Sequence, residues 1–299
     1  MRNFVFFILR LTGVPLILRE LIQRNKVTIL CYHDPALSIF EQHVRALKSR
    51  YNIISLKEYV DCRTGRSTQT LPPKSLVITI DDGFASNYHL QGVIANYGIP
   101  VTIFLCSGIV ATNRHYWWTA IQSQEAAVAM EKISDNERLR QLAKQGFKEL
   151  REYDTRQSLS SKEIHELKGI CDLQAHTQLH PNLPRCSMSR VRREITKSKI
   201  ELEQDYGLSI YALAYPNGKY GERETEIAKE AGYRCAVTMD SGVNNNMTDL
   251  FKLKRICIND TAGVSEVIVK SSGFWDVLRN IVPRRHGQAD LVASANSVE

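Results

Sequence analysis

The feature that most constrains the fold is the segment 75–83, SLVITIDDG, in which an apolar run ends in two adjacent carboxylates and a glycine. Its centre, 77–80, has the near-continuous apolar pattern of a parallel strand covered on both faces. Gly83 allows the chain to turn back where a side chain would obstruct. Asp81 and Asp82 are therefore expected at the carboxyl end of a strand, where open α/β sheets and α/β barrels place their ligand sites.

Two neighbouring carboxylates repel each other in a half-buried site unless a cation or a shared proton is present, so a metal ligand is worth seeking. A second polar cluster, QAHTQLHP at 174–181, contains His176 and His180. These residues are four apart, so a helical turn would place both imidazoles on one face, as divalent-metal sites need. Taken singly, the acids could equally cap a turn and the histidines could be surface residues.

Together, TIDDGF and HTQLHP resemble the first two signature motifs of the NodB-homology polysaccharide deacetylases. In that family the first motif reads T-F-D-D-G and the second H-[ST]-x-x-H. The resemblance implies that Asp81 is the catalytic base and that a divalent metal, with Zn²⁺ as the first choice, is held by Asp82, His176 and His180.

The third family motif, commonly R-P-P-Y-G, corresponds here to AYPNG at 214–218, which resembles a subgroup with an A-Y-P-x-G form. This alignment implies that Tyr215 contacts substrate and that the backbone N–H of Asn217 donates to the oxyanion. The arginine that usually orients the catalytic carboxylate is missing. Arg255, on an expected strand at 251–258, is the candidate substitute.

The fourth and fifth family motifs are not recognisable, and LKRI at 253–256 lacks the histidine that normally serves as general acid. His33 follows the expected strand VTILCY at 27–32, in a YHD segment that also occurs in some members of the family. It is the candidate acid; otherwise the enzyme is impaired. Trp117 and Trp118 follow another expected strand, 101–106, and could stack on sugar rings or form a satellite core.

The resemblance implies a metal-dependent hydrolase that removes N-acetyl groups from N-acetylhexosamine units of a polysaccharide or glycan precursor. Metal-activated water would be the nucleophile. Two alternatives stay open: a non-catalytic glycan-binding protein on the same fold, and a hydrolase of another non-peptide C–N bond.

The alternation of strand and helix patterns predicts an α/β fold, a distorted (β/α) barrel of about seven parallel strands. We expect an N-terminal amphipathic helix within 1–26, the deacetylase domain at 27–273, a charged helical insertion at about 119–157 and a polar tail at 274–299.

The N-terminal segment has apolar residues at helical spacing, and Gly13 and Pro15 should kink the helix. The members of this stripe are Phe4, Phe7, Ile8, Leu11, Leu18, Leu21 and Ile22. We expect residues 4–22 to lie on an anionic membrane surface. A docked core helix and an uncleaved anchor are the alternatives. Arg10 interrupts the apolar run, which argues against a secretory signal.

Charge and cysteine usage narrow the choice of partners. The formal net charge is +7, and residues 1–26 contribute five basic residues against one acid. No zinc-finger spacing or helix-turn-helix pattern indicates nucleic-acid binding. Seven cysteines without CxxC pairs are expected to be free thiols, which favours a reducing compartment. We therefore expect the cytoplasmic face of a membrane, with a periplasmic or extracellular anchored form left open.

Overall fold

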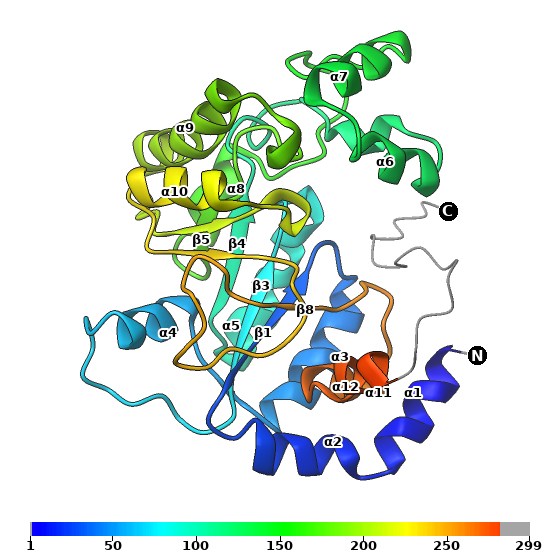
Figure 1. Ribbon diagram of the computed structural model, residues 1–299, viewed down its shortest axis with the longest axis vertical. Helices are drawn as coiled ribbons and strands as arrows, with labels where there is room; N and C mark the ends of the chain where they lie inside the picture. Colours follow the sequence, from blue (N-terminus) through cyan, green and yellow to red (C-terminus); the bar gives the residue numbers. More distant parts are fainter. Residues whose placement is uncertain (1, 282–299) are drawn as a thin grey trace.

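The computed structural model describes residues 2–281 and contains seven parallel strands curled into a half-barrel, in the order β7-β6-β5-β4-β3-β1-β8 (Figure 1). A short strand, β2, also pairs with β3. The predicted α/β fold is confirmed. The strands are β1 (Val27–Tyr32), β2 (Asn52–Ile53), β3 (Ser75–Ile80), β4 (Val101–Leu105), β5 (Asp172–Ala175), β6 (Ala212–Ala214), β7 (Cys235–Val237) and β8 (Ile256–Cys257).

The longest strands of the sheet are the neighbours β1 and β3, in which every residue is buried. Their register runs in parallel from Val27 opposite Ser75 to Tyr32 opposite Ile80. His33 and Asp81, which follow these two strands, therefore start from neighbouring positions. A bridge between Val237 and Leu253 links β7 to the segment before β8, so the two ends of the sheet approach each other.

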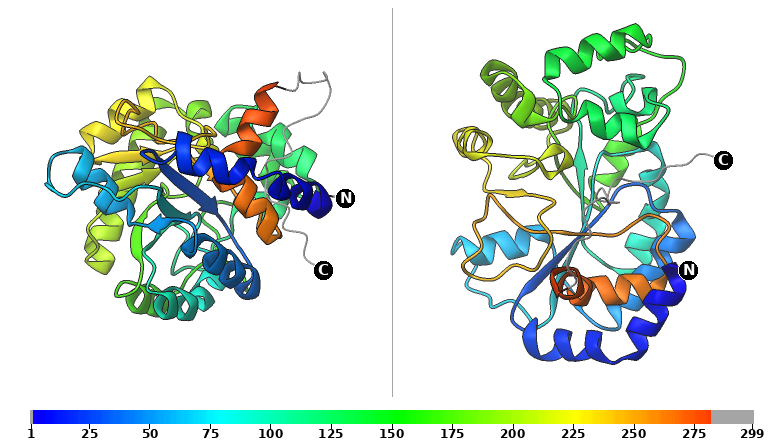
Figure 2. Two further views of the ribbon diagram at one scale, coloured as in Figure 1. Left: turned by 90° about the horizontal axis from the view of Figure 1, so that it is seen from below. Right: turned by 45° about the vertical axis from the view of Figure 1, so that its right-hand side comes forward.

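The helices surround this sheet (Figures 1 and 2). The longer ones are α1 (Arg2–Leu11), α3 (Leu37–Lys48), α4 (Leu56–Arg63), α5 (Gln91–Tyr97), α6 (Gln124–Met130), α7 (Asp135–Lys144), α8 (Ser161–Leu167), α9 (Met188–Tyr206), α10 (Glu222–Glu230), α11 (Val264–Ser271) and α12 (Phe274–Ile281). Shorter helical turns are α2 (Val14–Ile17), η1 (Leu18–Ile22), η2 (Ala85–Leu90), η3 (Trp117–Ala120), η4 (Leu183–Arg185) and η5 (Pro216–Gly218).

The segment between β4 and β5, which we call the insertion, contains helices α6 and α7, and these lie apart from the sheet in Figure 1. It has a small core of its own, built from Trp117, Met130, Leu142 and Phe147. The buried Arg138 lies over the Trp117 ring at 4.9 Å. The indole N–H of Trp117 donates to the His180 carbonyl oxygen at 3.0 Å, so the insertion braces the second histidine of the site.

The N-terminal segment is helical and is broken at Gly13, whose φ of 73° is left-handed, as the sequence predicted. It docks through a different face from the predicted stripe. Phe6 is buried against Val269 and Phe274, whereas most of the stripe is exposed. The periodicity located an apolar face correctly, but the neighbouring helices α11 and α12 decide which face becomes core.

The prediction of a polar tail from residue 274 is wrong for its first part, because Phe274–Ile281 forms α12. Phe274 is buried, and the Trp275 ring lies 4.9 Å from that of Phe6. This helix is stabilised by the N-terminal segment, a contact that no local pattern reveals. Residues 282–299 lie outside the described part of the chain. All seven cysteines are free, as expected.

Candidate metal and catalytic site

The turn after β3 holds both acids in place through its backbone. Asp82 has a left-handed φ of 72°, and Gly83 follows at 77°. A Cβ on Gly83 would lie 2.7 Å from a methyl carbon of Leu105, so a side chain there would displace the Leu105 side chain in addition to straining the backbone. The hydroxyl of Tyr116 donates to the Asp82 carbonyl oxygen at 2.9 Å. Backbone strain of this kind persists only where its surroundings over-determine it, which is typical of functional sites.

The two histidines lie on a loop after β5, and the prediction of a helical turn is wrong. Residues 176–180 form no helix, and Thr177 and His180 have φ values of 63° and 52°. The loop is held by Glu194 of α9, whose carboxylate accepts the backbone N–H groups of Gln178 and Leu179, each at 2.9 Å. The imidazoles converge because of this anchoring rather than because of helical spacing.

The structure brings Asp82, His176 and His180 together. The Nε2 atoms of both histidines lie 3.5 Å from Oδ1 of Asp82, and each residue of this triad offers a ligand atom within 4.8 Å of the others. Ligand atoms around a tetrahedral zinc are about 3.4 Å apart, given bonds of about 2.1 Å. The spacing of the triad therefore fits a divalent cation.

The electrostatics of the triad also fit a cation. Burial raises the pKa of Asp82 to about 7 and lowers the pKa of His176 to about 4. Burial also lowers the pKa of His180 well below its usual value. Neutral imidazoles are metal ligands, and Oδ1 of Asp82 has no hydrogen-bond partner in the described part of the chain. A positive charge at this point would compensate a buried carboxylate that is otherwise unfavourable.

Asp81 is held differently from its neighbour. The Arg255 guanidinium donates to both of its oxygens at 2.7 Å, in the bidentate geometry that planar arginine favours. Burial alone would raise the pKa of Asp81, but Arg255 and His176 hold it well below its usual value. Arg255 is itself oriented by donation to the Thr238 carbonyl and the Thr79 hydroxyl. Asp81 is therefore kept ionised.

His33 lies beside this pair. Its ring, the Cys31 thiol and the Asp81 carboxylate have ligand-type atoms within 4.8 Å of one another. Burial raises the pKa of Cys31 well above its usual value, and the protonated thiol contacts Asp81 at 3.5 Å. Asp260, after β8, accepts the His33 backbone N–H at 3.3 Å. His33 is half-buried, whereas Asp81 and the metal triad are nearly closed to solvent.

The loop of the third motif starts at the site, because the Ala214 carbonyl accepts Nδ1–H of His176 at 2.8 Å. Asn217 has a left-handed φ of 53°, and its buried side-chain Nδ2 has no partner among residues 2–281. The next residue, Gly218, packs so closely that a Cβ would lie 2.3 Å from Met239. Asn217 thus carries its amide donors on a closely packed loop whose first residue, Ala214, contacts a candidate metal ligand.

The structure separates the three predicted aromatic contacts with substrate. The Tyr215 ring is completely buried and stacks on Tyr220, so it offers no open face to a sugar. Trp117 is buried in the core of the insertion. Trp118 is partly exposed, and its ring lies 4.5 Å from that of His180. Of these three residues, Trp118 alone is placed both next to the metal triad and within reach of solvent.

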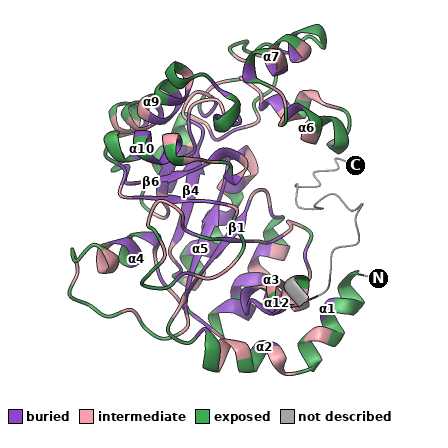
Figure 3. Cartoon of the chain, in the orientation of Figure 1, coloured by how far each residue is buried: buried purple, intermediate pink, exposed green. Residues whose placement is uncertain are grey.

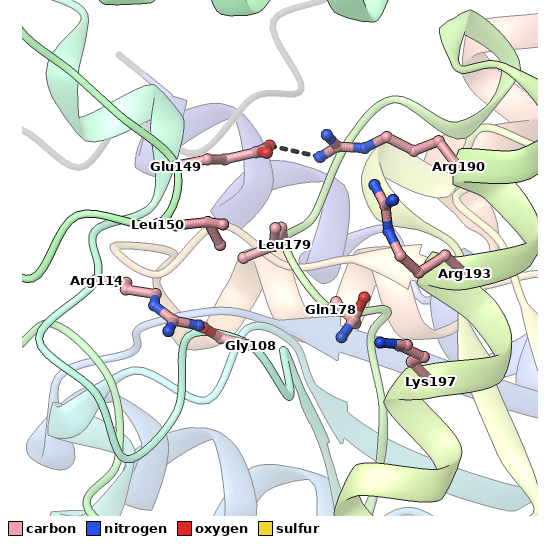
Figure 4. A pocket seen from close by; sticks show the side chains of 9 residues that line it. All are labelled: Gly108, Arg114, Glu149, Leu150, Gln178, Leu179, Arg190, Arg193 and Lys197. Carbon is pink, nitrogen blue, oxygen red and sulfur yellow. Dashed lines mark hydrogen bonds and ion pairs between the residues drawn. The ribbon is translucent and has the colours of Figure 1, made fainter.

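A pocket of about 370 Å³ borders the loop between the two histidines (Figure 4). Gln178 and Leu179 form part of its wall, and Glu149 of the insertion contacts Arg190 of α9 across it at 2.6 Å. Neither candidate metal ligands nor Asp81 line this pocket. This pocket is a mainly basic cleft beside the histidine loop, and it is separate from the candidate metal and catalytic site.

Sequence reasoning missed two acids that support the site, Glu194 and Asp260. Glu194 lies on the buried stripe of α9, which also contains Val191 and Ile195. A carboxylate on an apolar stripe indicates a buried charge, and a buried charge needs a partner, so this pattern could have predicted a supporting contact. Asp260 follows the last strand of the sheet, and the rule that strand ends converge would have placed it near His33.

Comparisons with known proteins point to one family. The family model described as polysaccharide deacetylase matches residues 68–236. A poly-beta-1,6-N-acetyl-D-glucosamine N-deacetylase of Staphylococcus aureus is 24% identical over 242 residues, covering 80% of this chain and 72% of the relative. Among solved structures, the Streptococcus pyogenes deacetylase PplD has a TM-score of 0.61 at 20% identity, covering 83% of this chain and 99% of that one. IcaB from Ammonifex degensii has a TM-score of 0.60 at 20% identity, covering 84% and 98%.

Proposed function

This chain belongs to the polysaccharide deacetylase family, and on that premise we propose that it is a metal-dependent hydrolase of N-acetylhexosamine units in a glycan. The observation that carries the proposal is the convergence of Asp82, His176 and His180 beside a separately held Asp81. Asp82 is positioned to bind a cation, and Asp81 is positioned to accept a proton. The relative from Staphylococcus aureus makes β-1,6-linked poly-N-acetylglucosamine the first substrate to test.

We propose that the triad holds a divalent metal, with zinc as the first candidate. When bound, such an ion would supply Lewis acidity and lower the pKa of a water ligand from about 15.7 to about 7. Asp81 would then accept the proton of the attacking water. Arg255 keeps Asp81 ionised and fixes its plane, while one oxygen retains capacity to accept a further hydrogen bond.

His33 and Asn217 have the remaining roles in the proposed reaction. Attack of water on the acetamide carbonyl carbon forms a C–O bond and places negative charge on the carbonyl oxygen. The backbone N–H of Asn217 is proposed to donate to that oxygen. When the C–N bond breaks, the nitrogen needs a proton, which His33 would supply. The products are acetate and a free amino sugar.

The first prediction concerns the metal triad. A His180→Ala protein is expected to lose both bound metal and acetate release. Loss of an outer partner alone costs about 10–100-fold in metal affinity, so loss of a ligand should cost more. Metal content by elemental analysis and acetate release from N-acetylglucosamine oligomers measure the two effects. His165→Ala, at an exposed position of α8, is the matched control. Parental metal content in His180→Ala would contradict the triad.

The second prediction tests the candidate acid. Replacing His33 with Gln is expected to lower acetate release about a hundredfold, because a positioned general acid contributes about 10²–10⁴-fold. Metal content should stay at the parental level, since His33 lies outside the triad. The exposed His89 provides the control variant His89→Gln. An unchanged rate in His33→Gln would remove His33 from the mechanism.

A further inference from the structure

The N-terminal helices carry an unusual concentration of exposed apolar side chains. Of the fifteen exposed large hydrophobic residues in the described chain, nine lie between residues 4 and 22. We call this set the N-terminal apolar face; its members are Phe4, Val5, Phe7, Ile8, Leu11, Leu16, Ile17, Leu21 and Ile22. Figure 3 shows α1 and α2 largely as exposed, in contrast to the buried sheet.

The segment that carries this face is fixed to the domain. Phe6 packs against Val269 and Phe274, and Arg2 contacts Glu266 at 2.5 Å. At the other end, the Gln23 side-chain amide donates to the Ser272 carbonyl at 2.5 Å. The N-terminal segment is therefore docked on α11 and α12, but these contacts leave its apolar face exposed.

Basic residues outnumber acidic ones beside the N-terminal apolar face, since residues 2–26 contain five basic side chains and one acid. One carboxylate, Glu20, is shared by three cations: Arg19 at 2.7 Å, Lys74 at 3.2 Å and Arg24 at 3.9 Å. The guanidinium of Arg50 lies close enough to Arg10 and Arg19 that, after burial, their charges lower its pKa. Another acid near this segment, Glu266, is paired with Arg2 and Lys270. The N-terminal segment and the residues that it contacts thus have an excess of positive charge.

We infer that the N-terminal apolar face is a docking surface for an anionic lipid bilayer. An apolar helical face rimmed by cations binds at the headgroup boundary, since apolar burial and attraction to anionic lipids add together. No helix in the described residues is both long and apolar enough to cross a bilayer. The exposed apolar side chains lie along a segment that is docked on the domain, so the proposed contact is one on the membrane surface.

This docking orients the proposed active site. Helices α2 and η1 lie at the end of the barrel where β1 begins, as Figures 1 and 2 show. The proposed active site lies beyond the other end of β1, and a strand of six residues is about 20 Å long. A bilayer at the N-terminal apolar face would therefore leave the metal triad facing the aqueous side. This step rests on the proposed function and implies a glycan segment that extends away from the lipid headgroups.

Vesicle co-sedimentation of the full chain tests the inference. Binding is expected with vesicles of phosphatidylcholine mixed with phosphatidylglycerol, and it should weaken with phosphatidylcholine alone and with added salt. Leu11→Glu should weaken binding at least about tenfold, the effect of losing one buried leucine. Arg10→Gln should weaken it about fivefold at low salt, the contribution of one basic residue near such a surface.

Matched controls distinguish vesicle binding through the N-terminal apolar face from nonspecific binding through any exposed apolar side chain. Leu150 in the insertion is exposed to the same extent as Leu11, 65%, so Leu150→Glu should bind vesicles like the parent. Circular dichroism should show both variants folded, because neither side chain is in the core. Equal loss of binding in both variants would overturn the inference. So would absence of vesicle binding together with a dimer that Leu11→Glu dissociates, which would make a second copy the partner.

Acetate release tests the orientation separately. Vesicle-bound protein is expected to deacetylate a soluble N-acetylglucosamine oligomer at the rate of the free protein. Inhibition by bound vesicles would show that the site faces the membrane. Vesicle binding without any acetate release, bound or free, would instead count against the proposed function and leave the docking surface supported.

Discussion

An Asp81→Asn protein is expected to release acetate about a thousandfold more slowly than the parent while it binds the same amount of metal. The amide cannot accept the proton of the attacking water, whereas the metal triad does not include Asp81. This is the sharpest separation that the site offers, because Asp81 and Asp82 are adjacent in the chain yet face different partners. Acetate release and elemental analysis on the same preparation measure both quantities.

The control for this variant is Asp205→Asn, an exposed position on α9, which should behave like the parent. Thermal unfolding should accompany the assay, since Asn leaves the buried Arg255 without its carboxylate partner. If Asp81→Asn loses its metal as well as its activity while staying folded, Asp81 is a ligand rather than the base. A parental rate would exclude it from proton transfer.

The second large effect is expected on stability. Replacing Arg255 with Met should lower the free energy of unfolding by about 3–5 kcal/mol, because it leaves the buried Asp81 carboxylate without its counter-ion. Arg255 is about 1% exposed, so water cannot take over its role. The same change should reduce acetate release, since the plane of Asp81 is no longer fixed. Urea denaturation with and without a chelator measures the stability of the metal-free and metal-loaded protein.

A double variant distinguishes the loss of charge pairing from the loss of packing. Asp81→Asn combined with Arg255→Met removes both charges, so it should be more stable than Arg255→Met alone. Arg193→Met, at an exposed position of α9, should stay within about 0.5 kcal/mol of the parent. A double variant no more stable than the single one would mean that Arg255 acts mainly through packing.

The order of the elements and the identity of the chemical groups could be predicted from the sequence. The run ending in Asp81 and Asp82 predicted a buried strand with acids at its carboxyl end, and β3 is that strand. The histidine pair was recognised from a motif, but the backbone conformation of its loop was not predicted. The loop has left-handed residues where a helical turn was expected. A spacing of four residues fits several backbones, and Glu194, far along the chain, selects this one.

In the N-terminal segment, too, the sequence predicted the local structure but not the long-range contacts. Its periodicity predicted an amphipathic helix and Gly13 its break, both of which local backbone energetics determine. The face that docks depends on α11 and α12, more than two hundred residues away in the chain, and the helix Phe274–Ile281 was not predicted. Long-range packing overrides a local pattern wherever a partner surface arrives from elsewhere in the chain.

The chemical groups of the candidate site and the strand ends that carry them follow from local sequence patterns, because strand periodicity and turn chemistry act over a few residues. The different surroundings of these groups arise from contacts between distant segments. The tertiary structure paired Asp81 with Arg255, left Oδ1 of Asp82 facing two imidazoles, and buried Tyr215 while leaving Trp118 beside His180. The physical reason is that charge pairing and burial depend on distances between segments, which the curvature of the sheet sets.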